Sequence, residues 1–160
     1  MRDASNTTFA DRLKYGKKGE LIVASYLSGK GYTIYHTDGT EQETVDLIAR
    51  RGNKTIFIEV KTKNKLKKIK GVALDHDKVL KYSITAANTE GVEFWIMFIE
   101  TVENKLYTIK VNDILKDFTD SNGDTFPNMT VIKDALVVSI EQMTYIKDLD
   151  MKEIDILNDV

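Results

Sequence analysis

Three charged residues stand inside two segments that otherwise consist mainly of apolar and β-branched residues. Asp46 interrupts the run Val45–Ala49, and Glu59 and Lys61 interrupt the run Ile56–Thr62. Because side chains alternate across a β-strand, Glu59 and Lys61 share one face. A buried charge costs several kcal/mol unless it is paired or binds a metal. Packing alone is therefore a poor explanation for these three residues.

Two neighbouring carboxylates and a lysine suit the hydrolysis of a phosphodiester. Carboxylate oxygens are the hard ligands that Mg²⁺ or Mn²⁺ takes, usually together with several waters. Such a metal lowers the pKa of a bound water and stabilises the charge of the transition state. A lysine beside it can orient or deprotonate the attacking water, or neutralise the scissile phosphate. Burial would lower the pKa of that lysine and nearby carboxylates would raise it, so both directions stay open.

Two predicted strands position Asp46 and Glu59. Strands are expected over residues 43–50 and 54–62, where β-branched and apolar residues are concentrated. The short turn over residues 51–53 contains a glycine and an asparagine and joins them as an antiparallel hairpin. Pairing through this turn brings Asp46 close to Glu59. The competing interpretation is an edge strand on which Glu59 makes an ordinary ion pair in solvent.

A predicted helix adds a third carboxylate to this set. The spacing from residue 8 to residue 30 is helical, with one inward stripe formed by Gly16, Glu20, Ala24 and Leu27. Glu20 is a charged residue on that stripe, and Gly29 and Gly31 are expected to end the helix. A set of Glu20, Asp46, Glu59 and Lys61 in this order is less compatible with a solvated surface than any one of them alone.

The remaining segments predict an α/β protein with a mixed central β-sheet flanked by helices. The expected elements are a strand over 32–37, a helix over 75–89 capped by Asp75, strands over 92–99 and 105–111, a helical turn over 112–118, a polar loop over 120–128, a strand-like segment over 129–140 and a helical tail from 141. We expect one domain over residues 1–160. Its core would cover about residues 8–111, and residues 112–160 would form an acidic extension packed on that core.

Charge is unevenly distributed along the chain. Residues 1–81 carry 17 Lys and Arg against 10 Asp and Glu, whereas residues 82–160 carry 6 against 15. Six of the ten residues over 61–70 are lysine, and such a block attracts polyanions. Because the whole chain has a net charge of −2, these data support only a local basic face, and a solvated loop is the alternative. The candidate DNA-binding residues are Lys63, Lys65, Lys67, Lys68 and Lys70.

Composition excludes several other kinds of site. There is no cysteine, so disulfides, thiolate metal sites and cysteine nucleophiles are excluded, and two histidines are too few for a three-histidine zinc site. No apolar run approaches the ~18 residues of a membrane span, and the first residues lack the apolar core of a secretory signal. We expect a cytoplasmic protein with no membrane partner. A phosphate-cradling glycine loop and a nucleotide-binding fingerprint are also missing, which makes a small-molecule enzyme a remote alternative.

These residues resemble a known superfamily. The run Thr44–Ala49 followed by Ile58–Thr62 resembles the motif of the PD-(D/E)XK nucleases, with Val45 where the superfamily's name has proline. Upstream, the segment Gly16–Glu20 resembles the first-helix signature of the Holliday-junction-resolvase-like and YraN-like branches. That signature continues through Ala24, Leu27, Gly31 and Tyr32. The resemblance covers about residues 16–100 and implies a restriction-endonuclease-like core.

The resemblance also implies roles for individual residues. Asp46 and Glu59 would be metal ligands, with the carbonyl of Val60 as a further ligand, and Lys61 would be the catalytic lysine. Glu20 would support the metal or its water as a carboxylate from the first helix. The later helix of such proteins often adds a polar residue to the site, for which Lys78 and Tyr82 are the candidates. The cofactor would be Mg²⁺ or Mn²⁺.

The sequence therefore predicts a metal-dependent deoxyribonuclease, and the resemblance implies an endonuclease that selects junctions or branched DNA. A homodimer follows if it resolves junctions, because one junction requires two active sites. The alternative is a nuclease-fold module that has lost cleavage and binds DNA or a protein partner. The complete acidic and lysine set argues against this alternative, because a binder gains nothing from carboxylates that face phosphates.

Overall fold

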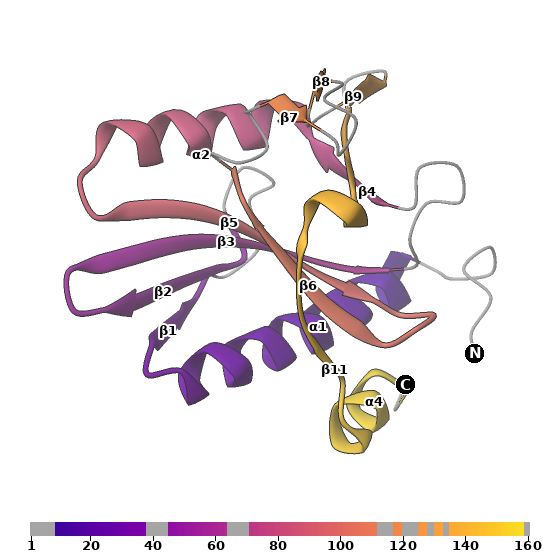
Figure 1. The fold of residues 1–160 in the computed structure, drawn as a ribbon. Coiled ribbons are helices and arrows are strands. Elements are labelled where there is room, and N and C mark those ends of the chain that lie inside the picture. The colour runs from indigo at the N-terminus through magenta and orange to yellow at the C-terminus, as the bar shows by residue number, and fades with distance from the viewer. Residues whose placement is uncertain are drawn as a thin grey trace.

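A mixed six-stranded sheet forms the centre of the protein in this computed structural model (Figure 1). The structure describes residues 9–37, 45–63, 71–111, 117–119, 125–127, 130–132 and 135–158. The strand order is β1 (Thr33–His36), β2 (Leu47–Arg51), β3 (Lys54–Lys63), β5 (Val92–Glu100), β6 (Lys105–Lys110) and β11 (Thr144–Asp148). Strands β3 and β5 are parallel and the other neighbours are antiparallel. The expected fold class, a mixed sheet flanked by helices, is confirmed.

The helices cover both faces of this sheet (Figure 1). Helix α1 (Phe9–Gly29) and helix α4 (Met151–Asn158) pack on one face, where Leu27 and Leu157 join Ile58 and Met97 in one core cluster. Helix α2 (His76–Asn88) packs on the opposite face, where Val79 belongs to a second cluster. α2 connects the parallel strands β3 and β5, as a crossover between parallel strands requires. The sheet is buried on both sides, which explains the almost continuous apolar run of β5.

Two smaller sheets lie beside the central one in the described part of the chain. Their strands come from the segment between β3 and α2 and from the chain after residue 111. Their strands are β4 (Gly71–Asp75), β10 (Ala135–Ser139) and β9 (Thr130–Ile132) in one sheet, and β7 (Asp117–Thr119) and β8 (Thr125–Pro127) in another. A short 3₁₀ helix, η2 (Ile140–Gln142), leads from β10 towards β11. The C-terminal part of the chain thus supplies β10 to the sheet of β4 and β11 to the edge of the central sheet.

The sequence missed some of these strands. β4 was not predicted, although Val72 and Leu74 alternate with more exposed residues and are buried. The helical tail expected from residue 141 is wrong over 144–148, where β11 pairs with β6. The segment contains Thr, Tyr and Ile, which are common in strands, and its pairing with β6 along the sheet edge determines the strand. Parts of the turn expected over 112–118 and of the polar loop expected over 120–128 are the strands β7 and β8.

Helix α1 lies unusually close to β3 at Gly19. A Cβ atom on Gly19 would overlap Thr62 Oγ1 and lie 3.0 Å from Thr62 Cβ, so rotating the threonine side chain gives little relief. A glycine is therefore required where Glu20 and the residues after Glu59 are brought together.

Gly19→Ala is expected to lower the free energy of unfolding by about 1–3 kcal/mol, the usual cost of overpacking. Gly16→Ala is the matched control on the same helix, because a Cβ atom on Gly16 would have no neighbour within 4 Å. That control is expected to be neutral or to stabilise by up to about 1 kcal/mol through helix propensity. Chemical denaturation of both variants measures the difference, and equal stability would contradict the close α1–β3 contact.

Candidate active site

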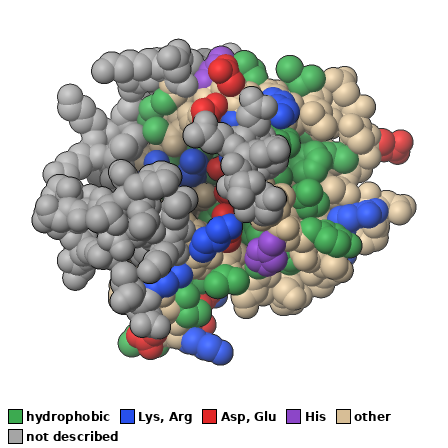
Figure 2. All heavy atoms as spheres, turned by 180° about the vertical axis from the view of Figure 1, so that it is seen from behind, with side chains coloured by type: hydrophobic (Ala, Val, Ile, Leu, Met, Phe, Trp, Pro, Cys, Tyr) green, Lys and Arg blue, Asp and Glu red, His purple; other side chains and the backbone are tan. Residues whose placement is uncertain are grey.

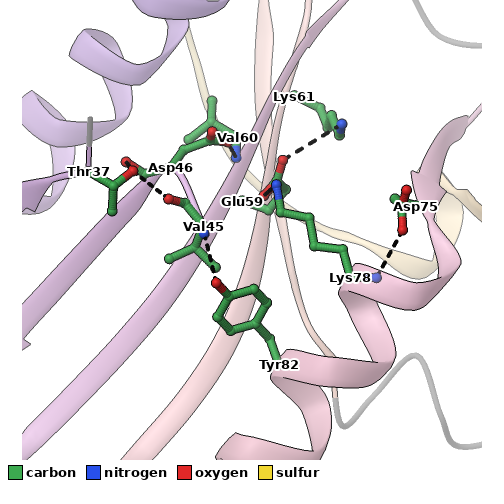
Figure 3. A network of polar contacts seen from close by, with 9 residues as sticks. All are labelled: Thr37, Val45, Asp46, Glu59, Val60, Lys61, Asp75, Lys78 and Tyr82. Atoms are coloured by element: carbon green, nitrogen blue, oxygen red, sulfur yellow. Dashed lines mark hydrogen bonds and ion pairs between the residues drawn. The ribbon is translucent and has the colours of Figure 1, made fainter. Parts of the chain in front are cut away.

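Asp46 lies just before β2, with its carboxylate directed at β3 (Figure 3). Its backbone N–H donates to the carbonyl oxygen of Ile58 at 3.1 Å, and Asp46 Oδ2 accepts from the backbone N–H of Val60 at 2.8 Å. The hairpin register that pairs Leu47 with Ile58 accounts for this position. The antiparallel pairing expected from the turn over residues 51–53 is thus present, and it places Asp46 beside the segment that carries Glu59.

Glu59 is a buried carboxylate that contacts two lysines (Figure 3). Its side chain is 8% exposed; Oε1 lies 3.7 Å from Lys61 Nζ and Oε2 lies 2.8 Å from Lys78 Nζ. Lys61 comes from the same face of β3, as the alternation predicts, and Lys78 comes from the first turn of α2. Of the two helix candidates, Lys78 therefore reaches the carboxylate itself.

Burial and the neighbouring charge of Asp46 raise the pKa of Glu59. Burial raises the pKa of Glu59 to about 7, with the charge of Asp46 as the second cause, while Lys61 and Lys78 act in the opposite direction. The two lysines thus offset only part of the cost of ionising this carboxylate next to Asp46.

Glu20 is the third carboxylate near Asp46. It lies on α1, which packs on the face of the sheet opposite to α2. Its Oε2 lies 3.7 Å from Lys17 Nζ. Burial, with the charge of Asp46 as the second cause, raises the pKa of Glu20 to about 6, while Lys17 acts in the opposite direction. Asp46 is therefore the common neighbour of Glu20 and Glu59. Three carboxylates from α1, the start of β2 and β3 meet around one end of the hairpin.

The donor chemistry of this group fits a divalent cation. Asp46 and Glu59 supply hard carboxylate oxygens. The raised pKa values of Glu20 and Glu59 reflect burial first and the charge of Asp46 second, and a bound cation would favour the ionised form of both groups. Val60 lies between Glu59 and Lys61, and its N–H is held by Asp46. Among the residues that the structure describes, no three acidic or histidine side chains form a ready-made metal site. A cation here would therefore bind to fewer protein carboxylates and keep waters, as Mg²⁺ usually does.

The basic residues divide into those near Glu59 and those outside the described ranges. Lys63 is partly buried at the end of β3, and burial lowers its pKa, helped by the charge of Lys61. Lys65, Lys67, Lys68 and Lys70 lie outside the described residues. Acidic and basic side chains gather near the middle of the face drawn in Figure 2. The described lysines of this region are thus Lys61 and Lys78, which contact the Glu59 carboxylate, and Lys63 at the end of β3.

Sequence reasoning missed two residues of this region. The Thr37 hydroxyl lies within hydrogen-bond distance of the carbonyl oxygens of Val45 and Asp46. Lys17 forms an ion pair with Glu20. Thr37 gave no signal beyond its place at the end of a strand, whereas Lys17 was readable as the i, i+3 partner of Glu20. Tyr82, expected as an accessory side chain, contacts the backbone N–H of Val45.

Comparison with known proteins identifies the family of this chain. Residues 19–90 match the family described as "Uncharacterised protein family UPF0102". A UPF0102 protein of Caldanaerobacter subterraneus is 34% identical over 113 residues, which cover 64% of this chain and 93% of that relative. The chain belongs to the UPF0102 family. A UPF0102 protein of Chlorobium limicola is 44% identical over 54 residues, which cover 33% of this chain and 42% of the relative. For this relative and for those of Dehalococcoides mccartyi and Phocaeicola vulgatus, the chain spans less than half of the relative's length.

A solved structure shows the fold of this UPF0102 chain. It is that of Hjc from Archaeoglobus fulgidus, a Holliday junction resolvase from an archaeal hyperthermophile. The TM-score is 0.56 at 16% sequence identity, with 79% of this chain and 85% of Hjc covered. The restriction-endonuclease-like fold implied by the sequence resemblance is thereby confirmed. Within its described residues, this UPF0102 chain contains no helix long and apolar enough to cross a membrane.

Proposed function

We propose that this UPF0102 protein is a metal-dependent nuclease that hydrolyses DNA phosphodiester bonds in the cytoplasm. The observation that carries the proposal is the meeting of Asp46 and Glu59, with Lys61 and Lys78 on the Glu59 oxygens, at one end of a buried hairpin. Such a cluster costs folding free energy, which a catalytic role explains and a packing role does not. The Hjc-like fold is consistent with this proposal.

In this mechanism, Asp46, Glu59 and the Val60 carbonyl are the groups that would hold Mg²⁺ or Mn²⁺, and Glu20 would support the metal or its water. The bound cation would supply an activated water and stabilise charge on the phosphate. Lys61, whose Nζ lies 3.7 Å from Glu59 Oε1, would orient or deprotonate the attacking water, or neutralise the scissile phosphate. Lys63 and the lysines at 65, 67, 68 and 70 bind the flanking backbone. The protein would act as an endonuclease on junctions or branched DNA, and as a homodimer when two cuts are needed.

A cleavage assay tests the proposal directly. Linear duplex, single strand, flap and four-way junction are incubated with the protein in Mg²⁺, Mn²⁺ or EDTA, beside the Lys61→Met variant. We expect cutting only with a divalent cation and a loss of about 10²–10⁴-fold in the variant, the typical contribution of a group that assists proton transfer. Binding should weaken steeply with salt, because phosphate contacts supply most of the affinity.

Two outcomes would overturn the nuclease proposal. Salt-sensitive DNA binding without cleavage in any metal would favour the module that binds but does not cut. Absence of both cleavage and binding would mean that the lysines of residues 61–70 form only a solvated surface. Cleavage that survives in Lys61→Met would point to a contaminating nuclease.

A further inference from the structure

The Val45–Asp46 peptide carries a candidate metal ligand but lies outside the regular strands. β1 ends at His36 and β2 begins at Leu47, so the ladder that pairs these strands does not include Asp46. A carboxylate that binds a cation or touches a reacting group must be held within a fraction of an ångström. Contacts other than the regular ladder must therefore fix this peptide.

Backbone and side-chain partners from three elements supply these contacts (Figure 3). The hydroxyl of Thr37, just after β1, donates to the carbonyl oxygen of Val45 at 2.6 Å and lies 3.2 Å from that of Asp46. The N–H of Asp46 donates to Ile58 on β3. The N–H of Val45 donates to the hydroxyl oxygen of Tyr82 on α2 at 3.1 Å. The backbone polar groups on both sides of the Asp46 carboxylate are thus held.

The Tyr82 hydroxyl is itself held by the packing of its ring. The ring centroid lies 5.6 Å from that of Phe57 and 5.4 Å from that of Phe94, in edge or tilted arrangements. α2 is fixed at its start by Asp75, whose side chain accepts from the backbone N–H of Lys78 at 2.9 Å. An anchored ring gives its hydroxyl a defined position with little rotamer freedom.

Lys78 and Tyr82 lie one turn apart on the same side of α2. Lys78 contacts Glu59 and Tyr82 contacts the peptide before Asp46, so one helix face reaches both segments that carry a carboxylate. A rigid helix that holds both segments sets the separation between them. The Tyr82 hydroxyl accepts from the backbone N–H of Val45, so it acts on the Asp46 carboxylate through the backbone.

We propose that Tyr82 is a positioning residue of the candidate site: its hydroxyl, by accepting the Val45 amide hydrogen, fixes the Asp46 carboxylate beside Glu59. Thr37 performs the same task on the carbonyl side of the peptide. This inference rests on the proposed function for its catalytic consequence, but its structural part holds without any cleavage. Loss of either hydroxyl leaves a backbone group without its partner and lets the Asp46 carboxylate move.

Tyr82→Phe tests the proposal, because it removes the hydroxyl and keeps the ring between Phe57 and Phe94. Amide hydrogen exchange followed by NMR is expected to be at least about tenfold faster at Val45 in the variant. The amide of Thr55, which donates to Gly91 at 2.8 Å, serves as the internal control and should not change. Tyr145→Phe is the matched control variant, since it removes an exposed hydroxyl that bonds Asp148 on β11.

Two further measurements connect this movement to the site. Calorimetric titration with Mn²⁺, without DNA, should show affinity weakened by about 10–100-fold in Tyr82→Phe, the usual effect of losing a group that orients metal ligands. In the cleavage assay kcat should fall while KM for DNA stays the same, since the Tyr82 hydroxyl acts on Asp46 through the Val45 amide. Thr37→Val should behave like Tyr82→Phe, and Thr37→Ser, which keeps the hydroxyl, should behave like the wild type.

The outcomes separate the two proposals. Unchanged exchange at Val45, or wild-type Mn²⁺ affinity with faster exchange, overturns the positioning role and leaves Tyr82 as a packing residue. A wild type that binds Mn²⁺ but cuts no DNA overturns the nuclease function alone. Lower thermal stability of Tyr82→Phe with wild-type exchange, affinity and kcat would also contradict positioning.

Discussion

Replacing Asp46 with asparagine is expected to lower DNA cleavage by about 10²-fold or more, while the protein keeps its fold. Asparagine has the shape of aspartate, and its side-chain oxygen can still accept the N–H of Val60 that Asp46 Oδ2 accepts at 2.8 Å. What is lost is the negative charge next to Glu59 and Glu20. Metal-assisted stabilisation of charge is worth several kcal/mol, and about 1.4 kcal/mol corresponds to tenfold in rate.

The same variant has a second expected effect that needs no activity. Because the charge of Asp46 raises the pKa of both Glu59 and Glu20, these two pKa values should fall in Asp46→Asn. NMR titration of the carboxyl carbons in EDTA measures both values. Asp148→Asn, which changes a carboxylate on β11, is the control and should leave them unaltered. Unchanged pKa values in Asp46→Asn would show that the three carboxylates do not share one site, whatever the cleavage assay gives.

Sequence reasoning succeeded where the relevant contacts are local. The positions of Glu59 and Lys61 follow from alternation along β3, and their relation to Asp46 follows from a hairpin with a short turn. The start of α2 at His76 follows from Asp75, whose side chain caps the helix. In each case a few neighbouring residues determine the geometry, so the pattern can be read directly.

Long-range contacts could not be read in this way. Tyr82 meets Val45 across 37 positions of the chain, and Thr37 meets it across eight, only because β1, β3 and α2 pack together. Thr, Tyr and Ile of β11 are typical of strands, but nothing in this segment alone indicates that its backbone pairs with β6 at the edge of the sheet. Polar groups whose partners are backbone atoms leave a weak pattern in sequence, since a backbone N–H is the same at almost every position.

Replacing Glu59 with glutamine is expected to remove most of a pH dependence from the stability of the protein. In the folded state Glu59 has a pKa raised to about 7 by burial and by the charge of Asp46, against an ordinary value of 4.5. Below pH 4.5 the carboxyl is protonated in both the folded and the unfolded state, so its stabilising contribution is fully present. As pH rises towards 7 the unfolded chain releases this proton and the folded chain does not, so stability falls.

The size of this change in stability follows from the rise in the pKa of Glu59. A rise from 4.5 to about 7 corresponds to about 3 kcal/mol of stability that the wild type loses between pH 4.5 and 8. Glutamine cannot ionise, although it also leaves Lys61 and Lys78 without their carboxylate. The expected result is therefore the change with pH: the stability of Glu59→Gln minus that of the wild type should increase by about 3 kcal/mol over this range.

Urea denaturation in EDTA at a series of pH values measures this difference without any metal. Taking the difference between the two proteins cancels titrations that they share, including most of the acid destabilisation of other groups. Glu141→Gln, a change at an exposed residue of η2, should give a difference that is flat with pH. A flat difference for Glu59→Gln as well would mean that Glu59 is not held against Asp46 in a buried site. A rising one would show that the fold sacrifices stability to keep this carboxylate, which is typical of a residue retained for function.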